Sequence, residues 1–94
     1  MAAEPTIDAA LVRLRELLAD NDVALLDLVN RRLELVDQIK RRKEELDVAF
    51  VDPEREAWLL DHLRSANKGR LSDEGLRELL TTLLELTKRE LSPG

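Results

Sequence analysis

Three cations occupy positions where a helix of this sequence would be expected to carry apolar residues. Alternating steps of four and three residues give the series Leu11, Arg15, Leu18, Asp22, Leu25, Val29, Arg32, Val36, Ile39 and Lys43. Six of these ten residues are apolar, which is the pattern of a coiled-coil seam. Three of the four exceptions are Arg15, Arg32 and Lys43. An ion withdrawn from water without a partner is costly, so cations on a seam favour a site for a small anion.

Structural explanations also remain open for these cations. Arg15 and Lys43 lie nearer the ends of the series, where long side chains can bend their charged heads into water. Asp22 could pair with a cation of a second chain, whereas Arg32 lies well inside the series and is harder to explain. The basic run Lys40–Lys43 is typical of a solvated face, and only its last residue falls on this seam.

The spacing of the cations predicts how a site would be assembled. Arg32 and Lys43 are eleven residues apart, about 16 Å along a helix, and side chains of this length could grip a small polyanion between them. Arg15 lies about 25 Å from Arg32 on the same helix, too far to join that site. In an antiparallel dimer, however, Arg15 of one chain returns beside the C-terminal half of the other. We therefore expect two equivalent sites, each built from both chains.

The elements that position these residues are predicted to be three helices. Neither Gly nor Pro occurs between about Ile7 and Leu46, which predicts a first helix of roughly 60 Å. Asp52 before Pro53 is typical of an N-cap followed by a first helical residue. Ser72, trailed by two acidic residues, is a second such start. The predicted helices span about 7–46, 53–66 and 72–91, and Asn67-Lys68-Gly69 predicts a left-handed stop after the second.

Composition supports this all-α architecture and excludes several classes of function. The 94 residues form at most one domain, taken as 1–94, and include 44% hydrophobic, 37% charged and only 2% aromatic residues. Such a mixture favours helices, and a chain this short has a thin core as a monomer. The very long first helix would therefore pack against a second copy. We expect an entwined antiparallel homodimer with no stable folded monomer.

The same counts exclude cysteine chemistry and argue against several partners. The chain has no cysteine and a single histidine, His62, which leaves neither a cysteine metal site nor an ordinary zinc cluster. The formal net charge of −5 disfavours nucleic acid. We see neither a signal peptide nor the roughly 20 apolar residues of a membrane span, so the cytoplasm is the expected compartment. His62 is expected at the surface and Trp58 in the core.

A further cation lies in the first turn of the second helix. The helix dipole favours the acidic neighbours of Arg55 there and disfavours Arg55 itself. Arg55 could be held structurally near Asp52 and Glu56. Equally, it could belong to the anion site, with Glu56 accepting a hydrogen bond from a ligand hydroxyl. Both interpretations remain open.

These residues, taken in order, resemble a known family. The set is Leu14-Arg15-Glu16, Asp22, Asn30-Arg31-Arg32-Leu33-Glu34-Leu35-Val36, Lys43 and Asp52-Pro53-Glu54-Arg55-Glu56. The resemblance is to the all-helical chorismate mutases and extends from about Leu11 to Thr87. It implies an interlocked dimer of three-helix chains. It also implies a cofactor-free isomerase of the shikimate pathway that converts chorismate to prephenate for phenylalanine and tyrosine biosynthesis. Members of the family occur alone or in complex with the enzyme that opens that pathway.

The resemblance also implies roles for individual residues. Arg15 of the partner chain and Arg32 resemble the arginines that grip the substrate carboxylates, and Lys43 resembles the lysine that donates to the ether oxygen. The remaining matches lie in or near the other two helices. Asp52 and Glu56 resemble residues near the ring hydroxyl, Arg55 resembles a supporting arginine, and Thr87 falls where a hydroxyl often lies near a carboxylate.

One position departs from the family pattern. Four residues after Thr87 the family usually has Gln or Glu as a second donor to the ether oxygen, but this chain has Leu91. Glu90 is adjacent, although one step turns a helix by about 100° and would point it elsewhere. This departure is compatible with a weak enzyme, with one that needs a partner protein, or with one that acts on a modified chorismate.

Two alternatives follow. One is a related activity on the same scaffold, either an aminodeoxychorismate mutase or an isochorismate pyruvate lyase, which substrate assays would distinguish. The other is a non-catalytic helical dimerisation module or regulatory subunit. In that case Arg32→Leu would stabilise the dimer without any loss of function, because an unneeded charge would have been removed.

Overall fold

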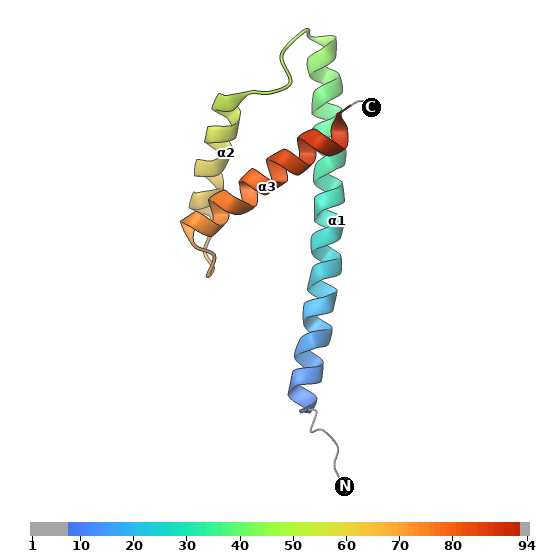
Figure 1. The fold of residues 1–94 in the computed structure, drawn as a ribbon, viewed down its shortest axis with the longest axis vertical. Helices are drawn as coiled ribbons and strands as arrows, with labels where there is room; N and C mark the ends of the chain where they lie inside the picture. Colours follow the sequence, from blue (N-terminus) through green and yellow to red (C-terminus); the bar gives the residue numbers. More distant parts are fainter. Residues whose placement is uncertain (1–7, 93–94) are drawn as a thin grey trace. The chain divides into compact units, whose positions relative to one another are not determined.

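The computed structural model describes residues 8–92, which form three helices in the order α1, α2 and α3 (Figure 1). Their bounds are Ala9–Glu45, Pro53–Ala66 and Asp73–Leu91, and no strand occurs within the described residues. The expected all-α class with a long first helix is therefore confirmed. The expected start of α1 at Ile7 lies outside the described residues.

α1 has 37 residues, about 55 Å of helix, with distinct chemistry at its two ends. At its start, the Asp8 carboxylate accepts a hydrogen bond from the Ala10 amide at 3.0 Å. At its end, Asp47 adopts a left-handed φ of 57°. The amide of Val48 donates to the carbonyl of Lys43 at 2.9 Å, and the amide of Asp47 donates to Glu44 at 3.1 Å. These two bonds form a Schellman motif, in which Leu46 is the C-cap and Asp47 is the left-handed residue that follows it.

The starts of α2 and α3 follow the sequence prediction. The Asp52 carboxylate accepts from the Arg55 amide at 3.1 Å, with proline at the first helical position. The Ser72 hydroxyl accepts from the Gly75 amide at 2.9 Å. Each cap satisfies one of the amides that a helix start leaves without an intrahelical partner.

The predicted left-handed stop after α2 is wrong. Asn67 is extended, with φ −74° and ψ 112°, and Gly69 has no left-handed φ either. The Asn67 side chain instead accepts from the Gly69 amide at 3.1 Å and donates to the Leu71 carbonyl at 2.8 Å. Because one amide side chain satisfies the local backbone groups, the turn needs no left-handed residue.

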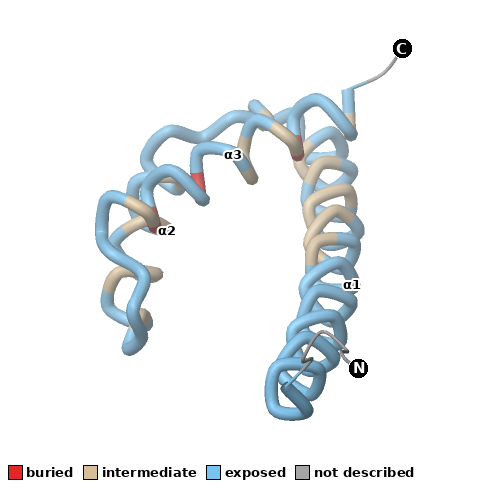
Figure 2. Tube along the Cα trace, turned by 60° about the horizontal axis from the view of Figure 1, so that its bottom comes forward, coloured by how far each residue is buried: buried red, intermediate tan, exposed pale blue. Residues whose placement is uncertain are grey.

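The chain divides into two units, residues 1–32 and 33–94. In the first, every described residue is exposed except Val29 and Arg32, and Figure 2 shows this part of α1 without a buried residue. In the second, α2 and α3 pack together, and Leu76 and Leu80 are buried. The described apolar residues of the first unit, apart from Val29, are thus exposed.

Two further expectations concern the aromatic face of α2. Trp58 was expected in the core, but 47% of it is exposed, so that expectation is wrong. Its indole stacks on the His62 ring, with centroids 4.7 Å apart and planes at 11°. His62 is exposed, as expected.

Candidate functional site

The ammonium of Lys43 is held by the backbone of the connection between α1 and α2. Lys43 is half-buried, and its Nζ donates to the Phe50 carbonyl at 2.9 Å. An ammonium has three donors, so this bond leaves two N–H groups for other acceptors. Lys43 is therefore positioned to donate to an anionic or polar ligand.

Lys40 lies close to the same connection and was missed by the sequence analysis. It is half-buried, and its Nζ donates to the Leu91 carbonyl at 2.6 Å. The same Nζ lies 5.9 Å from the centroid of the Phe50 ring. The expectation that this part of the basic run is solvated is wrong for Lys40. The available signal was its position three residues before Lys43, which places the two on the same side of a helix.

Thr87 is the buried polar residue near the end of α3. Only 5% of it is exposed, and its hydroxyl donates to the Leu83 carbonyl at 2.6 Å, one turn earlier. This bond directs the hydroxyl hydrogen to the preceding turn of the helix. Leu91 follows one turn later, half-buried, with its carbonyl bound to Lys40.

The first turn of α2 carries the other predicted residues. Asp52 is exposed and caps the helix, while Glu56 is half-buried. The Glu56 carboxylate lies 3.4 Å from the ammonium of Lys88 on α3. The Arg55 guanidinium lies 3.9 Å from the centroid of the Trp58 ring. Arg55 is thus held to Asp52 through its backbone amide only, and its side chain stacks on an aromatic ring.

The two predicted arginines belong to the first unit. Both lie on α1, seventeen residues apart, about 25 Å along the helix. Arg15 is exposed and Arg32 is half-buried. The other predicted residues, Lys43, Asp52, Arg55, Glu56 and Thr87, lie in the second unit.

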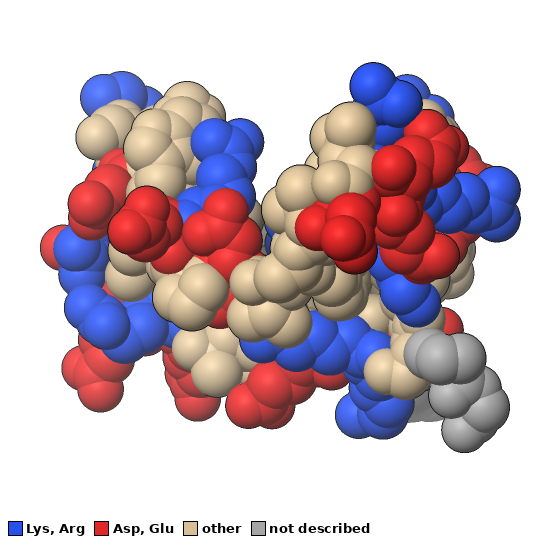
Figure 3. Space-filling view, turned by 90° about the horizontal axis from the view of Figure 1, so that it is seen from above, with Lys and Arg blue, Asp and Glu red and all other residues tan. Residues whose placement is uncertain are grey.

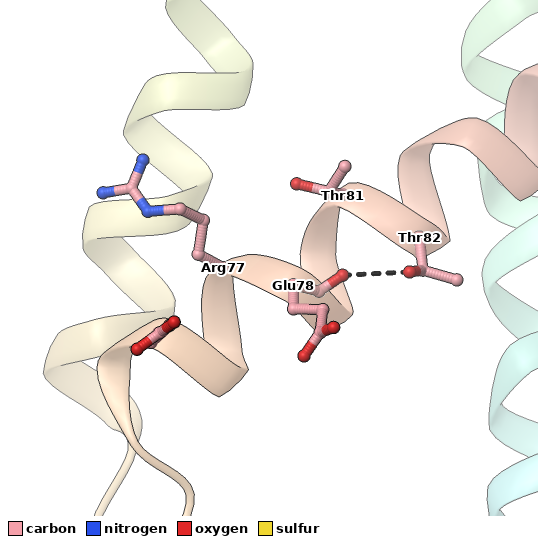
Figure 4. A pocket seen from close by; sticks show the side chains of 5 residues that line it. Arg77, Glu78, Thr81 and Thr82 are labelled. Atoms are coloured by element: carbon pink, nitrogen blue, oxygen red, sulfur yellow. Dashed lines mark hydrogen bonds between the residues drawn. The ribbon is translucent and has the colours of Figure 1, made fainter.

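A hollow on α3 is separate from these residues. It is lined by Glu74, Arg77, Glu78, Thr81 and Thr82 (Figure 4). The Thr82 hydroxyl donates to the Glu78 carbonyl at 3.0 Å, so its hydrogen bonds to the backbone of its own helix. None of the predicted site residues lines it.

Surface charge and hydropathy add two observations. On the face shown in Figure 3, acidic and basic side chains lie beside one another, so no large surface of one sign is present in that view.

Among the helices of residues 8–92, none combines the length and the apolar character needed to cross a bilayer.

Comparisons with known proteins agree with this picture. The sequence pattern of the family chorismate mutase type II matches residues 6–90. A bifunctional chorismate mutase/prephenate dehydratase of Pseudomonas aeruginosa is 32% identical over 92% of this chain and 25% of its own length. A protein of the same description from Stutzerimonas stutzeri is 34% identical over 69% of this chain and 20% of its own length. This chain thus spans about a fifth to a quarter of these curated relatives.

A solved structure supports the same assignment. Chorismate mutase (form II) from Thermus thermophilus matches with a TM-score of 0.82 and 28% identity. The match covers 90% of this chain and 99% of the other. The similarity therefore extends over nearly the whole three-helix arrangement of a chain of comparable extent.

Proposed function

The chain belongs to the chorismate mutase type II family, and we propose that it catalyses the rearrangement of chorismate to prephenate. The observation that carries this proposal is the half-buried Lys43 ammonium, fixed by a backbone carbonyl with donors to spare. A pericyclic step needs no nucleophile, general base or metal. It needs the substrate folded into its reactive conformer and the transition state favoured over the ground state.

Each proposed residue has a defined task in this reaction. As the C–O bond breaks and the new C–C bond forms, negative charge grows on the ether oxygen, and Lys43 donates to it. Arg32 and the partner chain's Arg15 clamp the two carboxylates, where charge-assisted and bidentate hydrogen bonds are strong. Thr87 supplies a hydroxyl near a carboxylate, and Arg55 supports the site at the start of α2. Glu56 and the Asp52 amide bind the ring hydroxyl.

The proposal includes an antiparallel, entwined homodimer. The unit of residues 1–32 exposes large apolar side chains along α1, including Leu14, Leu18 and Leu28. A contiguous exposed apolar surface of this kind is typical of an interface. A second copy that covered it would bring Arg15 of one chain to the site of the other. We further propose one domain over residues 1–94, action in phenylalanine and tyrosine biosynthesis, and a cytoplasmic location.

The leucine at position 91 is compatible with a second candidate function, a related reaction on a modified substrate. It offers the site no side-chain donor, so stabilisation of the charge that develops in the transition state rests more heavily on Lys43. An aminodeoxychorismate mutase or an isochorismate pyruvate lyase would use the same carboxylate clamp. Aminodeoxychorismate and isochorismate should therefore be assayed beside chorismate.

The experiment is to mix the purified chain with chorismate and follow both its loss and the appearance of prephenate. We expect turnover with chorismate and a fall of about 10²–10³ in kcat for Lys43→Met, as for other fixed donors to a developing oxyanion. Lys68→Met is the matched control, because it removes one exposed ammonium from the connection between α2 and α3. Absence of turnover, or an equal loss in the control, would refute the proposal.

A further inference from the structure

Lys40 is a half-buried cation whose two contacts are both uncharged. Its ammonium donates to the Leu91 carbonyl at 2.6 Å and lies 5.9 Å from the Phe50 ring centroid. Within residues 8–92, no carboxylate forms an ion pair with it. Partial burial of a charge without a counterion is unfavourable for stability, and an apolar side chain of similar length would cost less. Stability alone therefore gives a poor account of Lys40.

Phe50 connects Lys40 to Lys43. The Phe50 carbonyl accepts from the Lys43 ammonium at 2.9 Å, while the Phe50 ring faces the Lys40 ammonium. Two cations three residues apart on α1 thus contact the same residue of the connection to α2. Through Leu91, Lys40 also ties the last residue of α3 to this turn of α1. A displacement at Lys40 would move both the end of α3 and the acceptor that orients Lys43.

We propose that Lys40 is a positioning residue for the reaction, holding the end of α3 and Phe50 against the turn of α1 that carries Lys43. The proposal rests on the proposed function, because it acts through the donor role of Lys43 there. Lys40 itself need not touch the substrate. Its effect falls on kcat, because a misplacement of about 1 Å at a reacting group can cost up to about a hundredfold in rate.

The test compares three variants in the full chain. Lys40→Met keeps the length of the side chain and removes the ammonium, and Lys40→Arg keeps the cation. Arg41→Met removes an equal charge from the neighbouring residue, which is exposed and whose guanidinium pairs with Asp37. We expect kcat to fall about tenfold in Lys40→Met with KM changed less than twofold. Lys40→Arg should recover most of that loss, and Arg41→Met should leave kcat within twofold of wild type.

A double-mutant comparison separates positioning from a general structural role. If Lys40 acts through Lys43, Lys40→Met should cost little further activity in a chain that already carries Lys43→Met, because interacting residues are not additive. An undiminished tenfold loss in that background would overturn the proposal. So would wild-type kcat in Lys40→Met, or an equal loss of kcat in Arg41→Met, which would show that the loss follows the removed charge and not the contacts of Lys40.

Amide hydrogen exchange tests the same contact without activity. Lys40→Met should raise the exchange rate of the amides at residues 87–91 severalfold, while Arg41→Met should leave it unchanged. If wild type did not turn over chorismate, the proposed function would fail, and this exchange measurement would still decide whether Lys40 holds α3. Unchanged exchange in Lys40→Met would overturn the inference in either case.

Discussion

The Lys88 ammonium lies 3.4 Å from the Glu56 carboxylate, so an ion pair joins the first turn of α2 to the last turn of α3. Both partners remain partly exposed, with 44% of the Lys88 side chain and 32% of the Glu56 side chain accessible. Ion pairs with this degree of exposure contribute little to stability because water and salt screen them. The pair therefore leaves Glu56 able to serve a ligand.

Substitutions at the two partners should separate these roles. Glu56→Gln should raise KM for chorismate about tenfold, because a hydrogen bond from the ligand hydroxyl to a charged acceptor is weakened. Lys88→Met should change KM less than twofold and lower the free energy of unfolding by under about 1 kcal/mol. Steady-state kinetics and urea unfolding at equal protein concentration measure both. Equal KM effects in the two variants would show that Glu56 acts only through the pair.

The left-handed residue at the end of α1 predicts a stabilising substitution. Asp47 has a φ of 57°, which favours glycine, and it places a negative charge at the negative end of the helix dipole. Asp47→Gly should raise the free energy of unfolding by about 0.5–1 kcal/mol. The substitution removes the steric strain of the left-handed φ and the unfavourable charge, and together these outweigh the larger entropy that glycine loses on folding. Asp47→Asn, which removes only the charge, should gain less. A lower urea midpoint for Asp47→Gly would contradict this account.

Leu91 provides a test of gain in activity. Its carbonyl holds Lys40, a backbone contact that any side chain at this position can keep. Leu91→Gln should add a donor for the developing charge on the ether oxygen and raise kcat about tenfold or more. Glu90→Ala is the companion variant, because Glu90 is exposed and lies 3.7 Å from Arg89 in an ion pair. A fall in kcat for Glu90→Ala would indicate that Glu90 already supplies that donor.

The exposed apolar face of α1 predicts the state of assembly. Light scattering at micromolar concentration should give the mass of two chains, and the urea midpoint should shift to higher values as protein concentration rises. Leu18→Glu, which places a charge on the expected seam, should dissociate the dimer and unfold the chain. A compact, folded monomer in wild type would refute the entwined arrangement.

The shared site is tested by complementation between two inactive chains. Arg15→Ala and Arg32→Ala homodimers should each lose most activity, because every site lacks a carboxylate clamp. After the two variants are unfolded and refolded together, random pairing makes about half of the dimers mixed. In each mixed dimer one site carries both substitutions and the other carries neither. The mixture should then recover roughly a quarter of wild-type activity.

The control for this experiment is verified formation of the mixed dimer, for example by tags of different mass. If both arginines of a site came from the same chain, every site in every dimer would stay damaged. Activity near zero in a verified mixture would therefore reject the intersubunit site.

Local signals in the sequence predicted the helix starts well. Asp52 and Ser72 cap α2 and α3 as predicted, because each cap involves a side chain and an amide only three residues away. The predicted left-handed stop after α2 was wrong, and the cause is again a contact between residues close in sequence. The Asn67 side chain satisfied the backbone groups that a left-handed glycine would otherwise have rearranged.

Contacts between distant residues were not predictable in the same way. The partner of Lys40 lies 51 residues away at Leu91, and no periodicity along α1 encodes it. Trp58 was expected in the core, yet it lies on an exposed side of α2, where its ring contacts the Arg55 guanidinium and stacks on the His62 ring. The site residues were predicted from the types of residue and their spacing along the chain. Such a pattern does not tell which atoms each side chain contacts.

The bond between Lys43 and Phe50 has a consequence for how this protein can diverge. The acceptor is a backbone carbonyl, which every residue type carries, so substitutions at position 50 can accumulate without removing it. An insertion or deletion between α1 and α2 would instead shift the carbonyl away from the ammonium. Loops usually tolerate changes in length better than helices do. In relatives we therefore expect the number of residues between Lys43 and the start of α2 to be conserved, whatever residue type supplies the carbonyl at position 50.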